Sequence, residues 1–236
     1  SLTLLKNRKA FLKNKSDLFV NSELPAKKCS VGQLVKAALQ STTSQEDNII
    51  NKLWINNSSI NKNFKNTIPI IDTSFYSLRD NSNPLYNAIG LALRISEKTN
   101  PFKNRLFIYS NSPRWIIFNE NQTFVQKVRY LYKIISPTQN NFGSVLKLIA
   151  SKMAKNGLSM NEVTKLTFVV FSCKHSSKNN NLYYMVPEIF ANIGLEKNGI
   201  SYLPPRFIFW NLSPSNDFPA NSSQFNVALM SGNNSA

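Results

Sequence analysis

The sequence has few of the residues on which disulfide scaffolds, zinc fingers and nucleotide-binding loops depend. Its 236 residues include 2 cysteines, 1 histidine and 7 glycines. Cys29 and Cys173 are too few for a disulfide framework and lack metal-type spacing, which favours a reducing compartment. Because neither a Walker nor a dinucleotide-type glycine pattern occurs, no phosphate-binding loop is predicted.

Long apolar runs and a secretory start are also lacking. No run of about 18 apolar residues occurs, so we expect no membrane span. Residues 1–9 lack the apolar core and cleavage site of a signal peptide. We therefore predict a cytoplasmic protein, or a virion protein if the source is viral. A targeting segment upstream of Ser1 stays open, because the sequence does not start with Met.

Positive charge is what the sequence has in excess. It contains 28 Lys/Arg against 12 Asp/Glu, a net charge of +16, which favours an anionic partner such as nucleic acid or an acidic protein face. The excess is +7 in residues 1–66 and +9 in residues 67–236, whereas a nucleic-acid footprint should be clustered. A binding surface and an ordinary solvated surface therefore both stay open.

Short apolar runs alternate with segments of helical periodicity. Helices are predicted at residues 31–39, 46–55, 84–98, 124–135, 142–154 and 184–195. Strands are predicted to end at Asp72 and to cover residues 105–110, 115–118, 166–172, 206–211 and 225–230. This alternation predicts one Rossmann-like α/β domain, with a mostly parallel sheet and helices on both faces. The unbroken apolar run at 166–172 predicts a central strand.

Aromatic and basic residues in these segments have plain structural explanations. Trp54, Trp115 and Trp210 lie in apolar runs, so we expect them in the core. The segment 127–133 interleaves charge and aromatics as a nucleic-acid face does, but its tyrosines cannot both share the face of Lys127 and Lys133. We therefore predict an amphipathic helix with solvated lysines.

Five stretches, residues 68–74, 84–97, 171–172, 207–212 and 228–232, together resemble one known family. In order and spacing they are similar to the von Willebrand factor A-like domain of a poorly characterised family of giant DNA viruses, plants and fungi. That domain is distantly similar to the A-like domain of the Ro ribonucleoprotein autoantigen. The resemblance covers the chain from about residue 24 and implies a three-layer von Willebrand factor A-type sandwich at residues 66–236. Residues 1–65 would be a basic N-terminal arm with helices.

The resemblance also implies a metal-ion-dependent adhesion site at the upper edge of the sheet. Such a site takes an Asp-x-Ser-x-Ser loop, a Thr from a second loop and an Asp after a central strand, because Mg²⁺ prefers oxygen ligands. Asp72 and Ser74 match the first two positions. Tyr76 stands where the second Ser belongs, and Ser77 comes one residue too late.

The other two parts of the adhesion-site pattern are altered as well. Asn140 stands at the Thr position, Asn141 at the following Asp, and Cys173 replaces the last Asp. A thiol is a poor ligand for so hard an ion, so we expect a degraded site and no cofactor. A retained Mg²⁺ would use Asp72, Ser74 and Asn140. In a rescued site, Ser77, Thr138 and Asn140 would supply oxygens around Asp72.

We predict a non-enzymatic protein-interaction or scaffold module whose partner docks on this upper edge. The predicted edge residues are Asp72, Ser74, Tyr76, Ser77, Thr138, Asn140, Asn141 and Cys173. Two alternatives stay open, namely a basic RNA- or DNA-binding protein and a divalent-metal-dependent adhesion-type binder at Asp72. Asp72 also has a structural reading, as a carboxylate that accepts loop N–H groups. A nucleophilic Cys173 is not expected, because such chemistry needs a base within hydrogen-bond reach and a third group that orients it. His175 follows two residues later and could reach the thiol only if the loop turned back.

Overall fold

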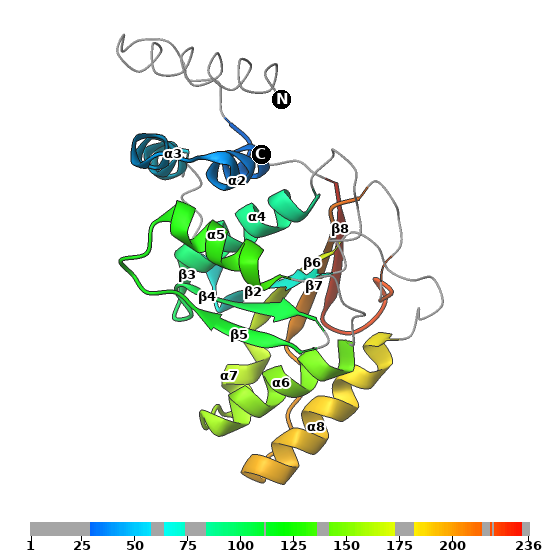
Figure 1. The fold of residues 1–236 in the computed structure, drawn as a ribbon. Helices are drawn as coiled ribbons and strands as arrows, with labels where there is room; N and C mark the ends of the chain where they lie inside the picture. Colours follow the sequence, from blue (N-terminus) through cyan, green and yellow to red (C-terminus); the bar gives the residue numbers. More distant parts are fainter. Residues whose placement is uncertain are drawn as a thin grey trace.

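Helices on both faces of a central sheet make up the architecture in Figure 1. The computed structural model describes residues 29–57, 64–73, 84–110, 112–135, 142–172, 182–213, 218 and 220–232. One face carries α4 (Pro84–Lys98) and α5 (Phe124–Ile134), and the other carries α6 (Phe142–Lys155), α7 (Met160–Thr164) and α8 (Met185–Asn198). The predicted Rossmann-like sandwich is therefore confirmed.

The main sheet has six strands in the order β5-β4-β2-β6-β7-β8. Five of them are parallel, namely β4 (Arg105–Tyr109), β2 (Thr67–Asp72), β6 (Thr167–Ser172), β7 (Arg206–Asn211) and β8 (Val227–Ser231). The edge strand β5 (Arg114–Ile117) runs antiparallel to β4. The chain steps outward from β2 to β4 and β5, then returns to β6 on the other side of β2. The strand order therefore reverses between β2 and β6, which makes this the topological switch point of the sheet.

The two central strands are buried on both faces, which explains their unbroken apolar sequences. All six residues of β2 are buried, and so are five of the six in β6. Ile71 and Phe171 face the core cluster beneath α4 and α5, whereas Ile70 and Val170 face the cluster beneath α6 and α8. The prediction of a central strand at 166–172 is confirmed.

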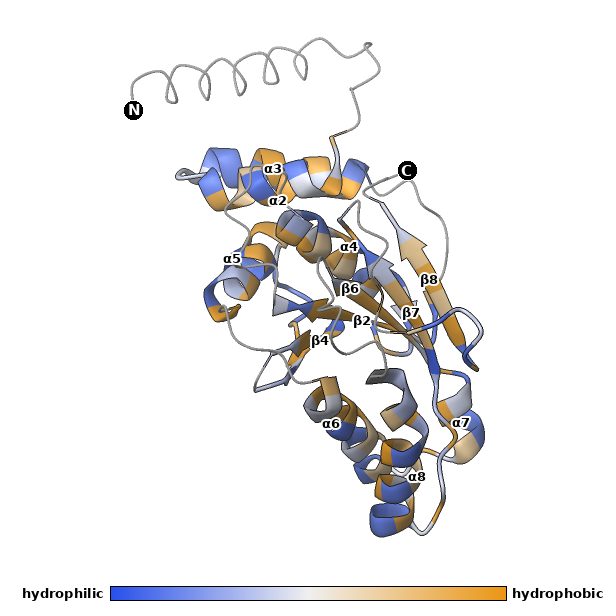
Figure 2. Ribbon diagram, turned by 90° about the vertical axis from the view of Figure 1, so that its right-hand side faces the viewer, coloured by the Kyte–Doolittle hydropathy of each residue, from blue (hydrophilic) through white to orange (hydrophobic). Residues whose placement is uncertain are grey.

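Two N-terminal helices form an additional outer layer over α4 and α5 (Figures 1 and 2). They are α2 (Val31–Gln40), which Ser30 caps by accepting the Gln33 N–H, and α3 (Ser44–Asn56). Leu34, Val35 and Trp54 are buried in the same cluster as the sheet residue Phe171. Residues 29–57 therefore share the hydrophobic core of the sheet.

A buried ionic network ties α3, α4 and α5 together. The Lys127 ammonium lies 3.0 Å from a Glu97 carboxylate oxygen and donates to the Asn104 side chain at 3.1 Å. The Trp54 indole N–H donates to the other Glu97 oxygen at 2.8 Å. Lys127 is only 5% exposed, so the prediction that this lysine is solvated is wrong. Its long stem crosses apolar surface to reach a carboxylate that only the packing of α4 against α5 supplies.

Several local features differ from the predicted ones. A short strand that was not predicted, β1 (Phe64–Lys65), pairs with β3 (Thr99–Asn100) in a separate two-stranded sheet. The short helix α7 was not predicted. Residues 1–28 of the predicted arm and residues 174–181, between β6 and α8, lie outside the described residues. Within the described part of the chain, every helix is too short or too polar to span a bilayer.

Candidate functional site

The carboxyl ends of the parallel strands bring polar side chains to one edge of the sheet. β2 ends at Asp72, β4 at Tyr109, β6 at Ser172 and β7 at Asn211. Asp72 pairs in register with Tyr109, and Ser172 pairs with Asn211. Asp72, Ser172 and Asn211 are at most 3% exposed. Since buried polar groups need hydrogen-bond partners, this edge is held together by specific polar contacts.

Hydrogen bonds fix the points at which the chain leaves the strands. The Thr73 hydroxyl donates to the Tyr109 carbonyl at 3.0 Å, which ties the exit of β2 to the end of β4. The Asn211 side-chain oxygen accepts the Ser213 N–H at 2.9 Å, in a turn that redirects the chain after β7. These contacts give the edge a defined shape next to the switch point.

Three of the connections that start or end at this edge carry the predicted site residues. Asp72 leads into residues 74–83 and Ser172 into residues 173–181, and these segments run to α4 and α8 on opposite faces of the sheet. The third, residues 136–141, ends at Phe142, whose ring centre lies 5.6 Å from that of Tyr109. The fold therefore brings one end of each predicted edge loop to the same edge of the sheet.

The predicted site residues fall into two groups. Asp72 lies at the end of β2, buried beside Tyr109. The rest lie outside the described residues: Ser74, Tyr76, Ser77, Thr138, Asn140, Asn141 and Cys173. Their arrangement around Asp72 stays a prediction, as does any pairing of Cys173 with His175.

Sequence reasoning did not select Thr73, Tyr109 or Asn211 as edge residues. Each of these residues ends an apolar strand or directly follows one. The polar residue at the end of every parallel strand could therefore have indicated the edge, in addition to the Asp-x-Ser motif. The register that places these positions at one level depends on strand pairing, which a single sequence does not give.

The surroundings of Tyr109 at this edge shift the pKa of its phenol. Burial, and secondarily the negative charge of Asp72, raises the pKa of the Tyr109 phenol well above its ordinary value of 10.0. A raised folded-state pKa contributes stability that is fully present below pH 10 and is lost as the pH rises above it, because the unfolded phenol ionises first.

We expect Tyr109→Phe to flatten the alkaline loss of stability. The free energy of unfolding, measured by urea titration at pH 8 and at several values above 10, should fall less steeply with pH in this variant than in the wild type. Tyr184→Phe, at a side chain that is 68% exposed, is the control and should leave the slope unchanged. Equal slopes for wild type and Tyr109→Phe would contradict the assignment.

The described strand ends supply only a small part of a ligand set for a resident Mg²⁺ ion. Asp72 is the only carboxylate that a described strand delivers to this edge, and the Asn211 oxygen already accepts a backbone N–H. Among the described residues, no three His, Cys, Asp or Glu side chains cluster as a metal site does. One carboxylate with scattered neutral oxygens offers little charge to a hard divalent ion, so we assign no chemistry to a metal here.

Comparisons with known proteins extend the structural description. Among solved structures, the Ro (RSR) protein of Deinococcus radiodurans is similar at a TM-score of 0.52 and 10% sequence identity, over 85% of this chain and 40% of that chain. At this identity the similarity concerns the fold, and the present chain spans about 40% of the Ro chain. The comparison with curated proteins gives no match.

One family model matches the sequence directly. It is described as "Domain of unknown function (DUF7788)", and it matches residues 66–236. The match begins next to β2, whose first residue is Thr67, and includes every strand of the main sheet. Since the match covers more than half of the chain, the protein belongs to the DUF7788 family.

Proposed function

We propose that this protein is a non-enzymatic protein-interaction or scaffold module. Its partner docks on the carboxyl edge of the sheet, next to the ends of β2 and β6, without a bridging metal. The observation that carries this proposal is the convergence of Asp72, Tyr109, Ser172 and Asn211 in register at the switch point. Open α/β sheets bind their ligands at this point, because the loops on its two sides diverge to opposite faces.

The contacts of the edge residues support a structural role for the polar groups. The Thr73 hydroxyl and the Asn211 amide are engaged with backbone atoms. Groups held in this way position loops, whereas catalysis would need a nucleophile, a base and an orienting group within hydrogen-bond reach of one another. The similarity to the Ro protein, which lies in the fold, is compatible with a binding module of the von Willebrand factor A type.

A comparative capture experiment tests the proposal. The tagged full chain is compared with Ser231→Glu at the carboxyl edge and with Arg206→Glu at the opposite end of the neighbouring strand, since both side chains are exposed. Proteins that copurify from cells of the source organism are quantified by mass spectrometry with EDTA present. We expect at least one protein to be retained by the wild type and Arg206→Glu and lost from Ser231→Glu. If every copurifying protein binds all three chains equally, the proposal is wrong.

The same experiment separates the two alternatives. Loss of the partner in EDTA and its return with Mg²⁺ would support metal-dependent binding at Asp72. Loss on nuclease treatment, with binding that falls steeply with salt, would support nucleic-acid binding through the excess Lys and Arg, because phosphate contacts release counterions. A cytoplasmic or virion location stays a prediction.

A further inference from the structure

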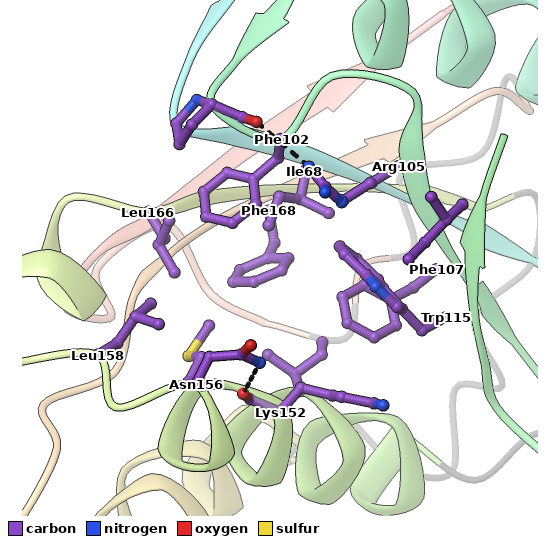
Figure 3. Close-up of a pocket in the computed structure, with 14 residues that line it drawn as sticks. Ile68, Phe102, Arg105, Phe107, Trp115, Lys152, Asn156, Leu158, Leu166 and Phe168 are labelled. Carbon is purple, nitrogen blue, oxygen red and sulfur yellow. Dashed lines mark hydrogen bonds between the residues drawn. The ribbon is translucent and has the colours of Figure 1, made fainter. Parts of the chain in front are cut away.

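The sheet is incompletely covered on the face that carries α6. β5 lies at the edge of the sheet, and its side chains on this face have no helix fully over them: Trp115 is half-buried and Ile117 is 60% exposed. The expectation that Trp115 lies in the core therefore holds only in part, because its ring packs against the core cluster but is half-buried at the edge of the sheet. A cavity of about 340 Å³ opens here, between the sheet and the last turns of α6 (Figure 3).

The walls of this cavity are mainly aromatic. The rings of Phe107 and Trp115 lie 4.2 Å apart between centres, and Phe168 lies 6.2 Å from Phe107. Phe102 completes the aromatic lining from the turn before β4 (Figure 3). A half-open hollow of this size and composition falls in the range of small-molecule sites, and its flat rings suit a flat apolar body.

The charged groups of the cavity are both cationic. Arg105, at the start of β4, and Lys152, on α6, contribute from opposite walls (Figure 3). Arg105 donates to the Pro101 carbonyl at 3.3 Å. Neither cation forms an ion pair with a carboxylate of the described residues, and no described Asp or Glu lines the cavity. The site therefore combines an apolar interior with two positive charges that no described carboxylate neutralises.

We propose that this cavity binds a small anionic amphiphile, namely a carboxylate with a flat apolar body. The body would lie among Phe102, Phe107, Trp115 and Phe168, and the carboxylate would accept hydrogen bonds from Arg105 or Lys152. A guanidinium and an ammonium are donors only, so they select an anion over a neutral or cationic head. Burial of apolar area supplies affinity and the cations supply selectivity.

This site is separate from the edge proposed for partner docking. Arg105 is the first residue of β4 and Tyr109 the last, and Ile68 and Phe168, which also line the cavity, lie near the starts of β2 and β6. The cavity therefore lies toward the amino ends of the strands. Its occupancy goes beyond the proposed function and can be tested independently of it.

Titration calorimetry of the full chain with 2-naphthoate and with its neutral isostere 2-naphthamide tests the proposal. The acid should bind at least about tenfold more tightly, as expected for hydrogen bonds to a charged group. Arg105→Gln or Lys152→Gln should remove most of this preference with little effect on the amide. Lys155→Gln, three residues further along α6, exposed and outside the lining, is the matched control and should behave as the wild type.

Variants of the aromatic wall test the other half of the proposal. Phe102→Leu and Trp115→Ala should weaken the acid and the amide alike, since both remove ring contacts, and thermal unfolding of each variant checks that it is folded. The proposal is overturned if millimolar 2-naphthoate does not bind, if acid and amide bind equally, or if Lys155→Gln loses the preference as Lys152→Gln does.

Discussion

Glu97→Gln is expected to destabilise the protein by about 2–4 kcal/mol, because it leaves the Lys127 ammonium in the interior without its counterion. The Lys127 side chain is 6% exposed and that of Glu97 is 23% exposed, so solvent compensates for little of the loss. Glutamine retains an acceptor for the Trp54 indole, which restricts the change to the charge. The free energy of unfolding from urea titration measures the effect.

Two further variants distinguish this buried pair from ordinary surface charge. In the Glu97→Gln background, Lys127→Met should restore part of the lost stability, and a double-mutant cycle gives the coupling energy of the pair. Glu196→Gln breaks the Lys197–Glu196 pair, whose side chains are 43% and 70% exposed, and should change stability by less than about 0.5 kcal/mol. Similar losses from Glu97→Gln and Glu196→Gln would contradict the assigned role of the buried pair.

Gly90→Ala is expected to destabilise the protein by about 1–3 kcal/mol through overpacking, although alanine is the better helix former by about 1 kcal/mol. Gly90 lies in α4 where α2 crosses it. A Cβ atom there would lie 2.8 Å from the Val31 Cβ and 3.0 Å from the Val31 carbonyl oxygen. Relief requires α2 to move as a unit, since one of these atoms is backbone.

Gly32→Ala is the matched variant on the other helix of this crossing. Its Cβ would meet the end of the Asn87 side chain, which can rotate, so the loss should be smaller than for Gly90→Ala. Hydrogen exchange adds a local measurement. In Gly90→Ala the amides of α2 should exchange faster relative to those of β6, because the helix is displaced from the core. A stabilised Gly90→Ala protein would show that the helices are not in close contact.

The two predictions concern contacts between the segment that the family model matches and the helices that precede it. The DUF7788 match begins at residue 66, whereas the hydrophobic core also includes Leu34 and Ile50 of α2 and α3. The core therefore extends upstream of the matched segment. Loss of the contacts of Gly90 or Glu97 would affect the docking of these N-terminal helices first.

The candidate site could be predicted from the sequence only in part. A polar residue that ends a buried apolar strand marks the carboxyl edge, and this placed Asp72 where the structure has it. The involvement of Tyr109 and Asn211 could not be derived, because strand register depends on pairing between segments far apart in the chain. The burial of Lys127 could not be predicted for a similar reason, since its partner Glu97 lies on another helix.

Most of the helices and strands around the main sheet, and the class of fold, follow from local sequence patterns. Helical periodicity, the Ser30 cap, Pro84 at the first turn of α4 and the apolar run of β6 are local signals that act through nearest neighbours. What these elements bury and expose depends on tertiary packing. The strand order brings the polar strand ends together, and α2 packs against Gly90. The same packing buries Lys127 and leaves the face beside Trp115 open. These outcomes depend on long-range packing, in which the environment of a side chain comes from segments that its own sequence neighbourhood does not specify.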